Sequence, residues 1–246
     1  PYAPETIDPQ VVKIAQNAAH YAVQKPDEVT DLVDFKQPEI SDTDLKAPIY
    51  IDFGPTSLSA TPWNNITSHQ ESSTTSWIKD VENNYTNIGV RVLDGFTATH
   101  AGVGSEPASP VTVDGVEFPL TAWKDGLLVK GEKNQGDVGP GRIEISQLDV
   151  ARKYNFTILA IRFNGSKDAR ISSYKLVGKT ESAVKEVKTG IKDAASFAAA
   201  NFEEYIAKFE NVEPDSEGKV IVEVKGLDTG SAAEGHINAL CISLAK

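Results

Sequence analysis

The feature that most restricts the fold of this chain is a series of short apolar runs, most of which follow one another without a helix-length segment between them. The runs begin at residue 48, are rich in Val, Ile, Phe and Tyr, and several alternate apolar with polar residues. They read PIYIDFG, NIGVRVL, VTVDGVEF, GLLVKG, RIEISQL, FTILAIRF, ISSYKLVG, KVIVEVKGL and HINALCISL. Successive strands without crossover helices favour antiparallel pairing over a parallel sheet covered by helices.

Dipeptides that suit tight turns stand beside these runs, and they are Asp94-Gly95, Asp114-Gly115, Asp125-Gly126 and Asn164-Gly165. Such pairs accept the positive φ angles that hairpin turns require. About nine or ten strands with regular turn signals are typical of a two-layer sandwich. We therefore predict an all-β fold, an antiparallel β-sandwich of the jelly-roll kind, over residues 48–246.

One late segment fits more than one element. Residues 193–209 have the alanine content of a helix, whereas Tyr205, Ala207 and Phe209 alternate as in a strand. We assign the alanine-rich part to a loop or short helix and residues 204–212 to a strand.

Residues 1–47 differ from the rest of the chain. Asp8 and Pro9 are typical of a helix start, with Asp as the cap and Pro at the first helical position. Apolar residues then recur at helical spacing as far as Pro26, and they are Val11, Ile14, Ala15, Ala18, Tyr21 and Ala22. Residues 26–47 are acidic and punctuated by proline, as in a linker or strap. We predict an N-terminal helix and linker, which in one interpretation packs against a neighbouring domain.

The charge, the apolar runs and the cysteine content of the chain exclude several classes of partner and site. With 24 basic and 35 acidic residues the formal charge is −11, which repels phosphate backbones and anionic lipids, so we expect no nucleic acid partner. No apolar run approaches the roughly 18 to 20 residues that cross a bilayer, so we expect no membrane span. The single cysteine, Cys241, excludes an internal disulfide and a cysteine-based zinc cluster.

The motifs follow in the order IDFG, PWNNIT, VRVLDGF, FPLTAWKDGL, IEISQLDVARKYNFTILAIR, ARISSYKLVG, FENVEPDSEGKVIVEVKG and GHINALCI. This order resembles the galactose-binding-like jelly-roll domains that serve as accessory or carbohydrate-binding domains in secreted proteins of polysaccharide-degrading bacteria. The resemblance covers about residues 48–246. It implies an exported protein, periplasmic, at the cell surface or extracellular, although this chain shows no signal peptide. It implies no reaction, because one such fold hosts many functions.

Trp63 is the first candidate for ligand contact, since it follows the first strand run in the motif PWNN, where we expect a loop. A flat indole can cover the apolar face of a sugar while the amides of Asn64 and Asn65 bond its hydroxyls. Covering roughly 80 to 100 Å² contributes about 2 kcal/mol, so one such site would bind in the millimolar range. In the alternative, Trp63 closes one end of the sandwich and the asparagines bond the backbone of a turn.

Trp77, Tyr85 and Arg170 complete the predicted ligand-binding set. Trp77 lies in the polar stretch SSTTSWIKD and Tyr85 in ENNYTN, and we expect both in exposed loops at one end of the molecule. Trp123, in FPLTAWKDG, alternates with apolar neighbours and is expected in a strand of the core.

Four charged residues were weighed as a group: Asp94, Asp125, Arg162 and Arg170. Arg162 interrupts the apolar run FTILAIRF, so its guanidinium should have a carboxylate partner or point outward. A structural Arg–Asp pair that holds two turns together is favoured over a ligand-binding role. His100 and His236, each taken alone, are interpreted as structural histidines with satisfied ring nitrogens.

The motifs of several enzyme classes are absent from the sequence, including G-x-S-x-G, H-E-x-x-H and the dinucleotide-binding loop. A glycoside hydrolase or lyase that uses a carboxylate pair stays open as an alternative, because 35 acidic residues supply many pairs. We expect no cofactor, although the acidic residues 213–217 could hold a structural calcium ion. We predict a non-catalytic glycan-binding or accessory module, with a structural spacer as a further alternative.

Overall fold

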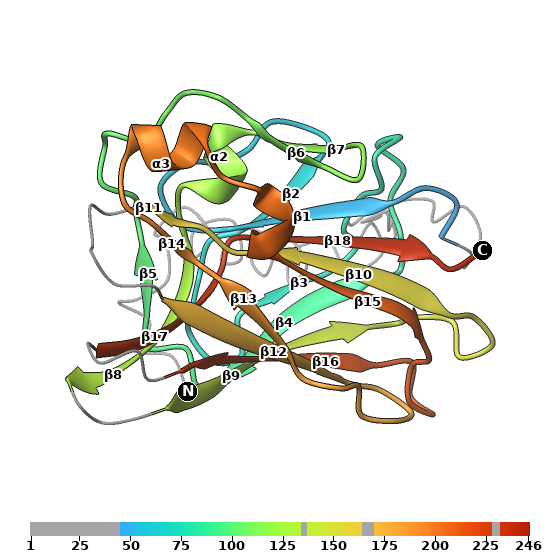
Figure 1. Cartoon of the computed structure of the whole chain (residues 1–246). Coiled ribbons are helices and arrows are strands. Elements are labelled where there is room, and N and C mark those ends of the chain that lie inside the picture. The colour runs from blue at the N-terminus through green and yellow to red at the C-terminus, as the bar shows by residue number, and fades with distance from the viewer. Residues whose placement is uncertain (1–44, 134–136, 164–169, 228–231) are drawn as a thin grey trace, which may run out of the picture. The chain divides into compact units, whose positions relative to one another are not determined.

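The computed structural model describes residues 45–133, 137–163, 170–227 and 232–246 (Figure 1). The helix predicted near the N-terminus lies outside these residues. No helix among the described residues is both long and apolar enough to cross a membrane.

A five-stranded sheet forms one layer of the fold, in the order β15-β10-β18-β1-β2. Its strands are β15 (Ile206–Val212), β10 (Tyr154–Leu159), β18 (Ala239–Leu244), β1 (Ile49–Phe53) and β2 (Trp63–Ile66). Neighbouring strands are antiparallel except β1 and β2, which are parallel.

A six-stranded antiparallel sheet forms the second layer, in the order β13-β12-β16-β9-β4-β3, and Figure 1 shows it below the first. Its strands are β13 (Lys185–Lys188), β12 (Ile171–Val177), β16 (Val220–Gly226), β9 (Val138–Ser146), β4 (Gly89–Asp94) and β3 (Thr74–Thr75). The prediction of an all-β sandwich with mainly antiparallel strands is confirmed.

Smaller elements complete the fold. A three-stranded sheet has the order β17 (Ala232–Ile237), β8 (Gly126–Lys133) and β5 (Ala98–His100), and β11 (Arg162–Phe163) is parallel to β14 (Gly190–Ile191). The hairpin of β6 (Val111–Val113) and β7 (Val116–Phe118) turns at Asp114 and Gly115, whose φ angles of 51° and 75° confirm the predicted turn. The helical segments are α2 (Leu120–Trp123), α3 (Ala194–Ala198) and the 3₁₀ turn η3 (Phe202–Tyr205).

The main hydrophobic core lies between the two large sheets, because alternate residues of each strand point inward. In β9, Ile143 and Ile145 are fully buried, whereas their neighbours Arg142, Glu144 and Ser146 are partly exposed. Val222 and Val224 of the neighbouring strand β16 belong to the same core. The period-two pattern of the sequence therefore reports correctly which face of this sheet is buried.

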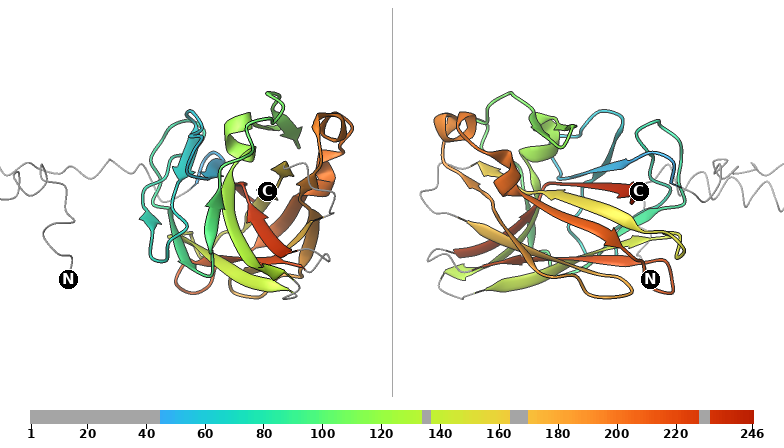
Figure 2. Two further views of the ribbon diagram at one scale, coloured as in Figure 1. Left: turned by 90° about the vertical axis from the view of Figure 1, so that its left-hand side faces the viewer. Right: turned by 45° about the vertical axis from the view of Figure 1, so that its right-hand side comes forward.

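The five-stranded sheet is apolar on both faces. In β18, Leu240 and Ile242 belong to the core between the sheets, whereas Ala239 and Cys241 belong to a second hydrophobic cluster. That cluster also contains side chains of the β6–β7 hairpin, α2 and α3, which lie together on one side of the five-stranded sheet in both views of Figure 2. Two buried faces explain why INALCISL reads as a continuous apolar run.

Two sequence-based assignments can be judged here. Trp123 is fully buried, as predicted, but it ends the helix α2 and is not part of a strand. The reason is local, since Pro119 precedes the helix in an extended conformation and its fixed φ suits a helix start. Residues 193–209 form short helical segments followed by β15, which begins at Ile206, so that assignment is confirmed to within two residues of the predicted strand start.

Candidate functional site

Trp63 lies in strand β2, so the predicted loop position was wrong. The chain turns back after β1 and pairs with it in parallel, which places Trp63 beside Tyr50. The Trp63 ring centroid lies 5.1 Å from that of Tyr50 and 5.7 Å from that of Phe118. Trp63 is half-buried and packs against the second hydrophobic cluster. Whether it contacts a glycan stays a prediction.

The amides of Asn64 and Asn65 bond the backbone, as in the alternative interpretation. Asn64 Nδ2 donates to the carbonyls of Tyr50 (2.9 Å) and Lys79 (2.7 Å), and its Oδ1 accepts from the Lys79 N–H (2.8 Å). Asn65 exchanges hydrogen bonds with both backbone groups of Ser59. These contacts fix the loops on either side of β2 and occupy the groups that were expected to meet sugar hydroxyls.

Trp77 and Tyr85 lie outside the strands, and both are exposed, at 41 % and 42 %. The Ile78 N–H donates to the Ile88 carbonyl and the Thr86 N–H to the Ile78 carbonyl, which closes the loop that contains Tyr85 and begins directly after Trp77. Lys79 Nζ lies 4.6 Å from the centre of the Tyr85 ring, which holds that ring against the segment. Their placement is compatible with ligand contact, which stays a prediction.

The structural Arg–Asp pair is found for Asp94, but its partner is Arg142, with Nη1 to Oδ2 at 3.1 Å. Asp125 accepts hydrogen bonds from Thr56 and Ser57. Arg170 instead pairs with the carboxylate of Glu234, a residue that the sequence-based interpretation did not consider. The charge of the same carboxylate acts on Arg162.

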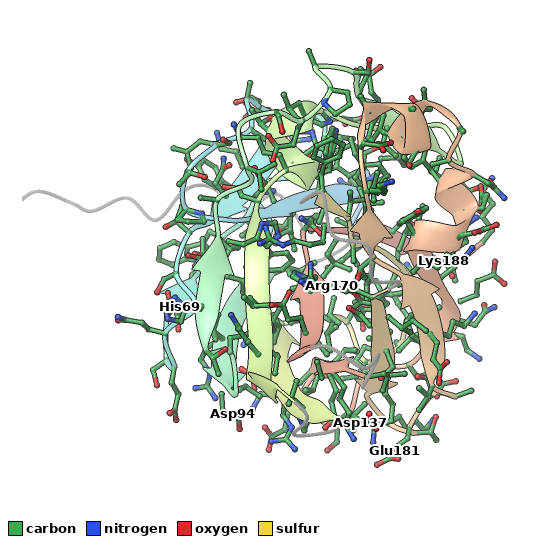
Figure 3. All side chains as sticks on the ribbon, turned by 60° about the vertical axis from the view of Figure 1, so that its left-hand side comes forward. His69, Asp94, Asp137, Arg170, Glu181 and Lys188 are labelled. Carbon is green, nitrogen blue, oxygen red and sulfur yellow. The ribbon has the colours of Figure 1, made fainter. Side chains whose placement is uncertain are left out.

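Five side chains gather at one end of the sandwich, and we call them the Arg–His–Glu cluster: Arg162, Arg170, Glu234, His236 and His100. Glu234 and His236 stand two apart on β17, so they share a face of that strand. His100 ends β5, which pairs with β8 and through it with β17. Figure 3 shows Arg170 at this end, between the green strands β5 and β8 and the tan strands further along the chain.

Thr189 holds the two arginines next to one another. Its backbone N–H donates to the Arg170 carbonyl at 2.9 Å, and its carbonyl accepts from the Arg162 N–H at 2.5 Å. Arg170 then pairs with Glu234, and the charge of Arg162 acts on the same carboxylate. The parallel pairing of β11 with β14 therefore positions residues that are eight apart in sequence.

Glu234 is the centre of the cluster. Its Oε2 lies 3.2 Å from Arg170 Nε and 3.3 Å from His236 Nε2. The side chains of Arg170, Glu234 and His236 are 12 %, 8 % and 0 % exposed. Burial favours the protonated acid, but the contact with His236 and the charges of the two arginines outweigh it and lower the pKa of Glu234. Glu234 is therefore an anion near neutral pH.

Both histidines of the cluster are neutral near pH 7. Burial lowers the pKa of His236, and it lowers that of His100 well below its usual value, with the nearby arginine charges acting in the same direction. The two rings meet edge to face with centroids 5.3 Å apart. A neutral imidazole has one nitrogen that donates a hydrogen bond and one that accepts.

The cluster holds buried polar atoms that have no hydrogen-bond partner within the described residues. They are Nε of Arg162, Nε and Nη1 of Arg170, Oε2 of Glu234, both ring nitrogens of His236 and Nδ1 of His100. Arg170 forms an ion pair with Glu234 and the neutral His236 ring lies close to the same oxygen, but neither contact meets the geometry of a hydrogen bond. An unpaired buried polar group costs about 1–3 kcal/mol. A group of such atoms at one place is consequently the strongest sign of a ligand site in this domain.

A second pair of buried acids, Asp52 and Asp125, shapes the loop next to the cluster. Asp125 Oδ2 accepts from the N–H and hydroxyl of Thr56, both at 2.9 Å, and Asp52 Oδ2 accepts from the Ser59 N–H at 3.1 Å. The Asp125 carbonyl accepts from Asn238 Nδ2, which lies 3.4 Å from His100 Nε2. With exposures of 1 % and 0 %, these two carboxylates hold the fold and do not face a substrate.

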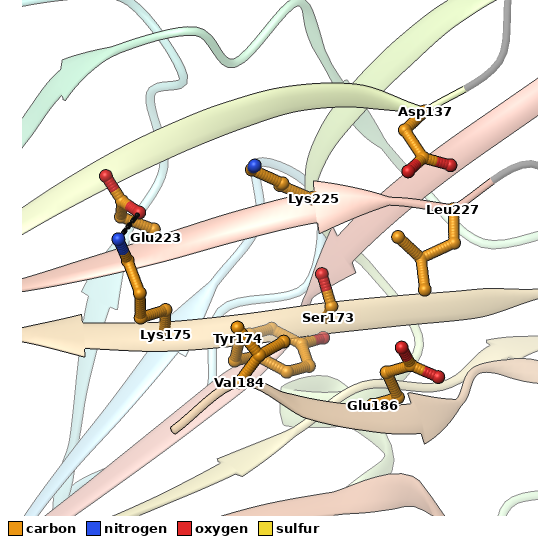
Figure 4. A pocket seen from close by; sticks show the side chains of 9 residues that line it. All are labelled: Asp137, Ser173, Tyr174, Lys175, Val184, Glu186, Glu223, Lys225 and Leu227. Atoms are coloured by element: carbon orange, nitrogen blue, oxygen red, sulfur yellow. Dashed lines mark ion pairs between the residues drawn. The ribbon is translucent and has the colours of Figure 1, made fainter. Parts of the chain in front are cut away.

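The charges on the outer face of the six-stranded sheet are paired in a regular way. Arg142 bonds Asp94 and Glu223, and Lys175 pairs with Glu223 and Glu181 at 3.2 Å each. We call these five residues the charge ladder. Figure 4 shows its Lys175–Glu223 pair beside a hollow of about 240 Å³ on this face. Because the ladder is hydrogen-bonded and open to water, it is typical of a solvated sheet face.

The proposed calcium site stays a prediction. In the acidic turn, Asp215 Oδ1 accepts from the backbone N–H groups of Glu217 and Lys219, and Glu213 pairs with Lys153 and Lys179. Among the residues with a described position, no three His, Cys, Asp or Glu side chains are grouped as metal ligands would be.

Comparison with known proteins gives structural similarities only. No family model and no curated protein matches the sequence. TmCBM61, solved in complex with β-1,4-galactotriose, has 13 % identity and a TM-score of 0.30 over 49 % of this chain and 71 % of its own. The ANX2 ectodomain of Arabidopsis thaliana has 7 % identity and a TM-score of 0.45, over 80 % of this chain and 49 % of its own. The insecticidal delta-endotoxin Cry8Ea1 of Bacillus thuringiensis has 12 % identity and a TM-score of 0.29, over 49 % of this chain and 20 % of its own. With all three TM-scores below 0.5, we infer function from the side chains alone.

Proposed function

We propose that this domain is a glycan-binding module and that the Arg–His–Glu cluster supplies its polar contacts. The observation that carries the proposal is the set of buried donors and acceptors without partners at one end of the sandwich. A sugar hydroxyl both donates and accepts, so neighbouring hydroxyls can meet a guanidinium, a carboxylate and a neutral imidazole at once. Few other ligands match such a mixture.

Binding is favoured over hydrolysis by the negative charge of Glu234 and by the burial of the two other acids near it. Hydrolysis of a glycoside by the usual route needs two carboxyl groups about 5 to 10 Å apart, one of which is protonated. Glu234 is held as an anion by its neighbours. The pKa of Asp52 is raised to about 7, but Asp52 and Asp125 are both buried and bonded to the loop of residues 56–59. The module therefore acts as a non-catalytic binder in this proposal.

The exported, polysaccharide-utilising setting that the sequence resemblance implies belongs to the same proposal. Trp77 and Tyr85 extend the contact surface if the glycan is longer than one unit. For a single sugar we expect millimolar affinity, because hydrogen bonds to charged groups contribute about 1.5–3 kcal/mol each and association entropy offsets much of their sum.

The test is a binding titration of neutral and acidic monosaccharides against the wild-type protein, Arg170→Ala and Glu234→Gln, with thermal unfolding as the check on folding. We expect both variants to lose at least tenfold in affinity. Arg142→Ala is the matched control, since it removes an ion-paired arginine from the charge ladder, and it should bind as the wild type does. Unchanged binding by a folded Arg170→Ala variant would overturn the assignment, as would a wild-type protein that binds no glycan.

A further inference from the structure

The outer face of the five-stranded sheet carries a hollow of about 220 Å³ beside the region covered by the β6–β7 hairpin. Its lining includes Tyr50, Val116, Asn155, Thr157, Lys208 and Ser243. We call it the sheet-face hollow. None of these residues belongs to the Arg–His–Glu cluster.

Strand register explains why a hollow forms at this position. Lys208, Thr157, Cys241, Tyr50 and Trp63 are directly paired across all five strands in turn. Directly paired residues point to the same face of a sheet, so these side chains form one row. Thr157 and Cys241 in the middle are small, while the residues at either side are large. The row is therefore low at its centre and raised at both sides.

One side of the hollow is aromatic. The Tyr50 ring is half-buried and has the Trp63 ring 5.1 Å behind it at an angle of 37°, so its position is supported by a second large ring. Such a supported ring can cover the apolar C–H face of a sugar with little loss of side-chain freedom. This is the kind of surface that the sequence-based interpretation assigned to Trp63 itself.

The floor and the opposite side supply hydrogen-bonding groups. Within the described parts of the chain, the hydroxyls of Thr157 and Ser243 and the Nδ2 of Asn155 have no hydrogen-bond partner. Lys208 is neutralised by two carboxylates, since its Nζ contacts Asp114 and lies 2.7 Å from Glu203 Oε2. The hollow consequently offers polar contacts without an excess of positive charge, which fits a neutral ligand.

A second hollow, of about 460 Å³, continues from the first. The two share Pro48, Asn155 and Ser243, and the second extends to Leu45 and Leu244. A ligand that begins at Tyr50 can therefore run along the sheet for more than one sugar unit.

We propose that the sheet-face hollow is a second glycan site, which takes a short run of neutral sugar units stacked on Tyr50 and bonded by Asn155, Thr157 and Ser243. The proposal rests on the proposed function for its class of ligand, but it uses different residues. The two sites can therefore fail separately.

The test uses Thr157→Gln, which fills the hollow without removing a core side chain, since Thr157 is only partly buried. Thr75→Gln is the matched control, because Thr75 is an exposed strand threonine of the six-stranded sheet. Both variants, the wild type and Arg170→Ala are titrated calorimetrically with monosaccharides and with β-1,4-linked tri- and hexasaccharides of galactose, glucose, xylose and mannose. Thermal unfolding verifies that each variant is folded.

We expect Thr157→Gln to lose at least tenfold in affinity for a neutral hexasaccharide and to keep the binding of monosaccharides at the cluster. Arg170→Ala should show the opposite pattern, and Asn155→Ala should lose about three- to tenfold for the hexasaccharide. If a folded Thr157→Gln variant binds all oligosaccharides as the wild type does, this second site is overturned while the cluster stands. If only Thr157→Gln loses binding, the sheet-face hollow stands and the cluster fails.

Discussion

Two regions of this domain contain an arginine paired with a glutamate, and they differ in almost every other respect. In the charge ladder, Arg142 Nε donates to Glu223 Oε1 at 3.0 Å, and the arginine side chain is 37 % exposed. In the Arg–His–Glu cluster, Arg170 Nε lies 3.2 Å from Glu234 Oε2 without pointing at it, and only 12 % is exposed. The exposed pair has satisfied its hydrogen bonds, whereas the buried pair has not.

The difference separates a solvated surface from a binding site. Polar groups in water find partners at little expense, so the ladder needs no ligand to explain it. Polar groups in the interior lose solvation and must recover it from partners, so unpaired atoms there indicate a partner that comes from outside. Four predictions can break or sharpen this contrast, and they begin with the largest expected effect.

Removal of the central carboxylate should be far more damaging in the cluster than in the ladder. Glu234→Ala leaves Arg162 and Arg170 close together and mostly buried, and we expect it to lower the free energy of unfolding by about 3–5 kcal/mol. Glu223→Ala should cost about 1 kcal/mol or less, since its partners stay hydrated. Urea denaturation of both variants measures the two values. Equal losses would contradict the contrast.

The pH dependence of stability should also separate buried from solvated acids. Burial raises the pKa of Asp52 to about 7, the Ser59 hydrogen bonds oppose this, and the charge of Asp125 adds to it. The folded state therefore holds the proton more tightly than the unfolded state, whose value is near 3.8. Stability is then complete below that value and falls as pH rises through about 7, by about 2–4 kcal/mol.

Asp52→Asn should remove this fall, which denaturation at a series of pH values can show. Glu213 provides the opposite case, because its contacts with Lys179 and Lys153 in solvent lower its pKa to about 2. The stability that the ionised Glu213 carboxylate adds to the folded state is present at neutral pH and is lost as the pH falls towards that value. A wild-type protein with constant stability between pH 4 and 8 would contradict the burial of an ionisable Asp52.

Glycan should stabilise the protein through the cluster and not through the ladder. A ligand at one hundred times its dissociation constant adds about 2.7 kcal/mol to the free energy of unfolding. We expect this gain in the wild type and in Arg142→Ala, and its loss in Arg170→Ala. Thermal unfolding with and without the best monosaccharide of the panel measures it, and an equal gain in Arg170→Ala would place that ligand elsewhere.

The exposed aromatic residues should have the smallest effect on stability. Trp77→Ala and Tyr85→Ala each change a surface side chain, so the free energy of unfolding should change by less than about 0.5 kcal/mol. If either ring covers a sugar, its removal should lower polysaccharide affinity by about tenfold, which affinity electrophoresis can measure. Unchanged affinity in both variants would remove these two residues from the contact surface.

Local patterns in the sequence were sufficient to predict the β-sandwich fold. Period-two alternation in β9 and the Asp114-Gly115 turn act over neighbouring residues, so they could be read without knowledge of the fold. The second hydrophobic cluster was indicated less clearly, by the continuous apolar run around Cys241, which is typical of a strand with two buried faces. The helix α2 was missed because Trp123 and its apolar neighbours fit a strand as well as a single helical turn.

The candidate site could be predicted only in part. Arg170 was among the predicted contact residues and Arg162 was noted because it interrupts an apolar strand, but His236 was interpreted as a structural histidine near a turn and Glu234 was not considered. Two polar residues two apart in sequence were the available signal, since they share one face of a strand. Asn64 and Asn65 were misleading because an amide that meets a sugar and one that bonds a backbone have the same sequence context.

The sequence by itself determined that this chain builds stacked antiparallel sheets, since the apolar period and the turn residues are properties of adjacent positions. Only the tertiary structure decided which polar residues would meet. His100 and His236 come together through the pairing of β5, β8 and β17, and Arg162 lies next to Arg170 through the pairing of β11 with β14. Such long-range register depends on how the whole core packs, and no short stretch of residues contains it.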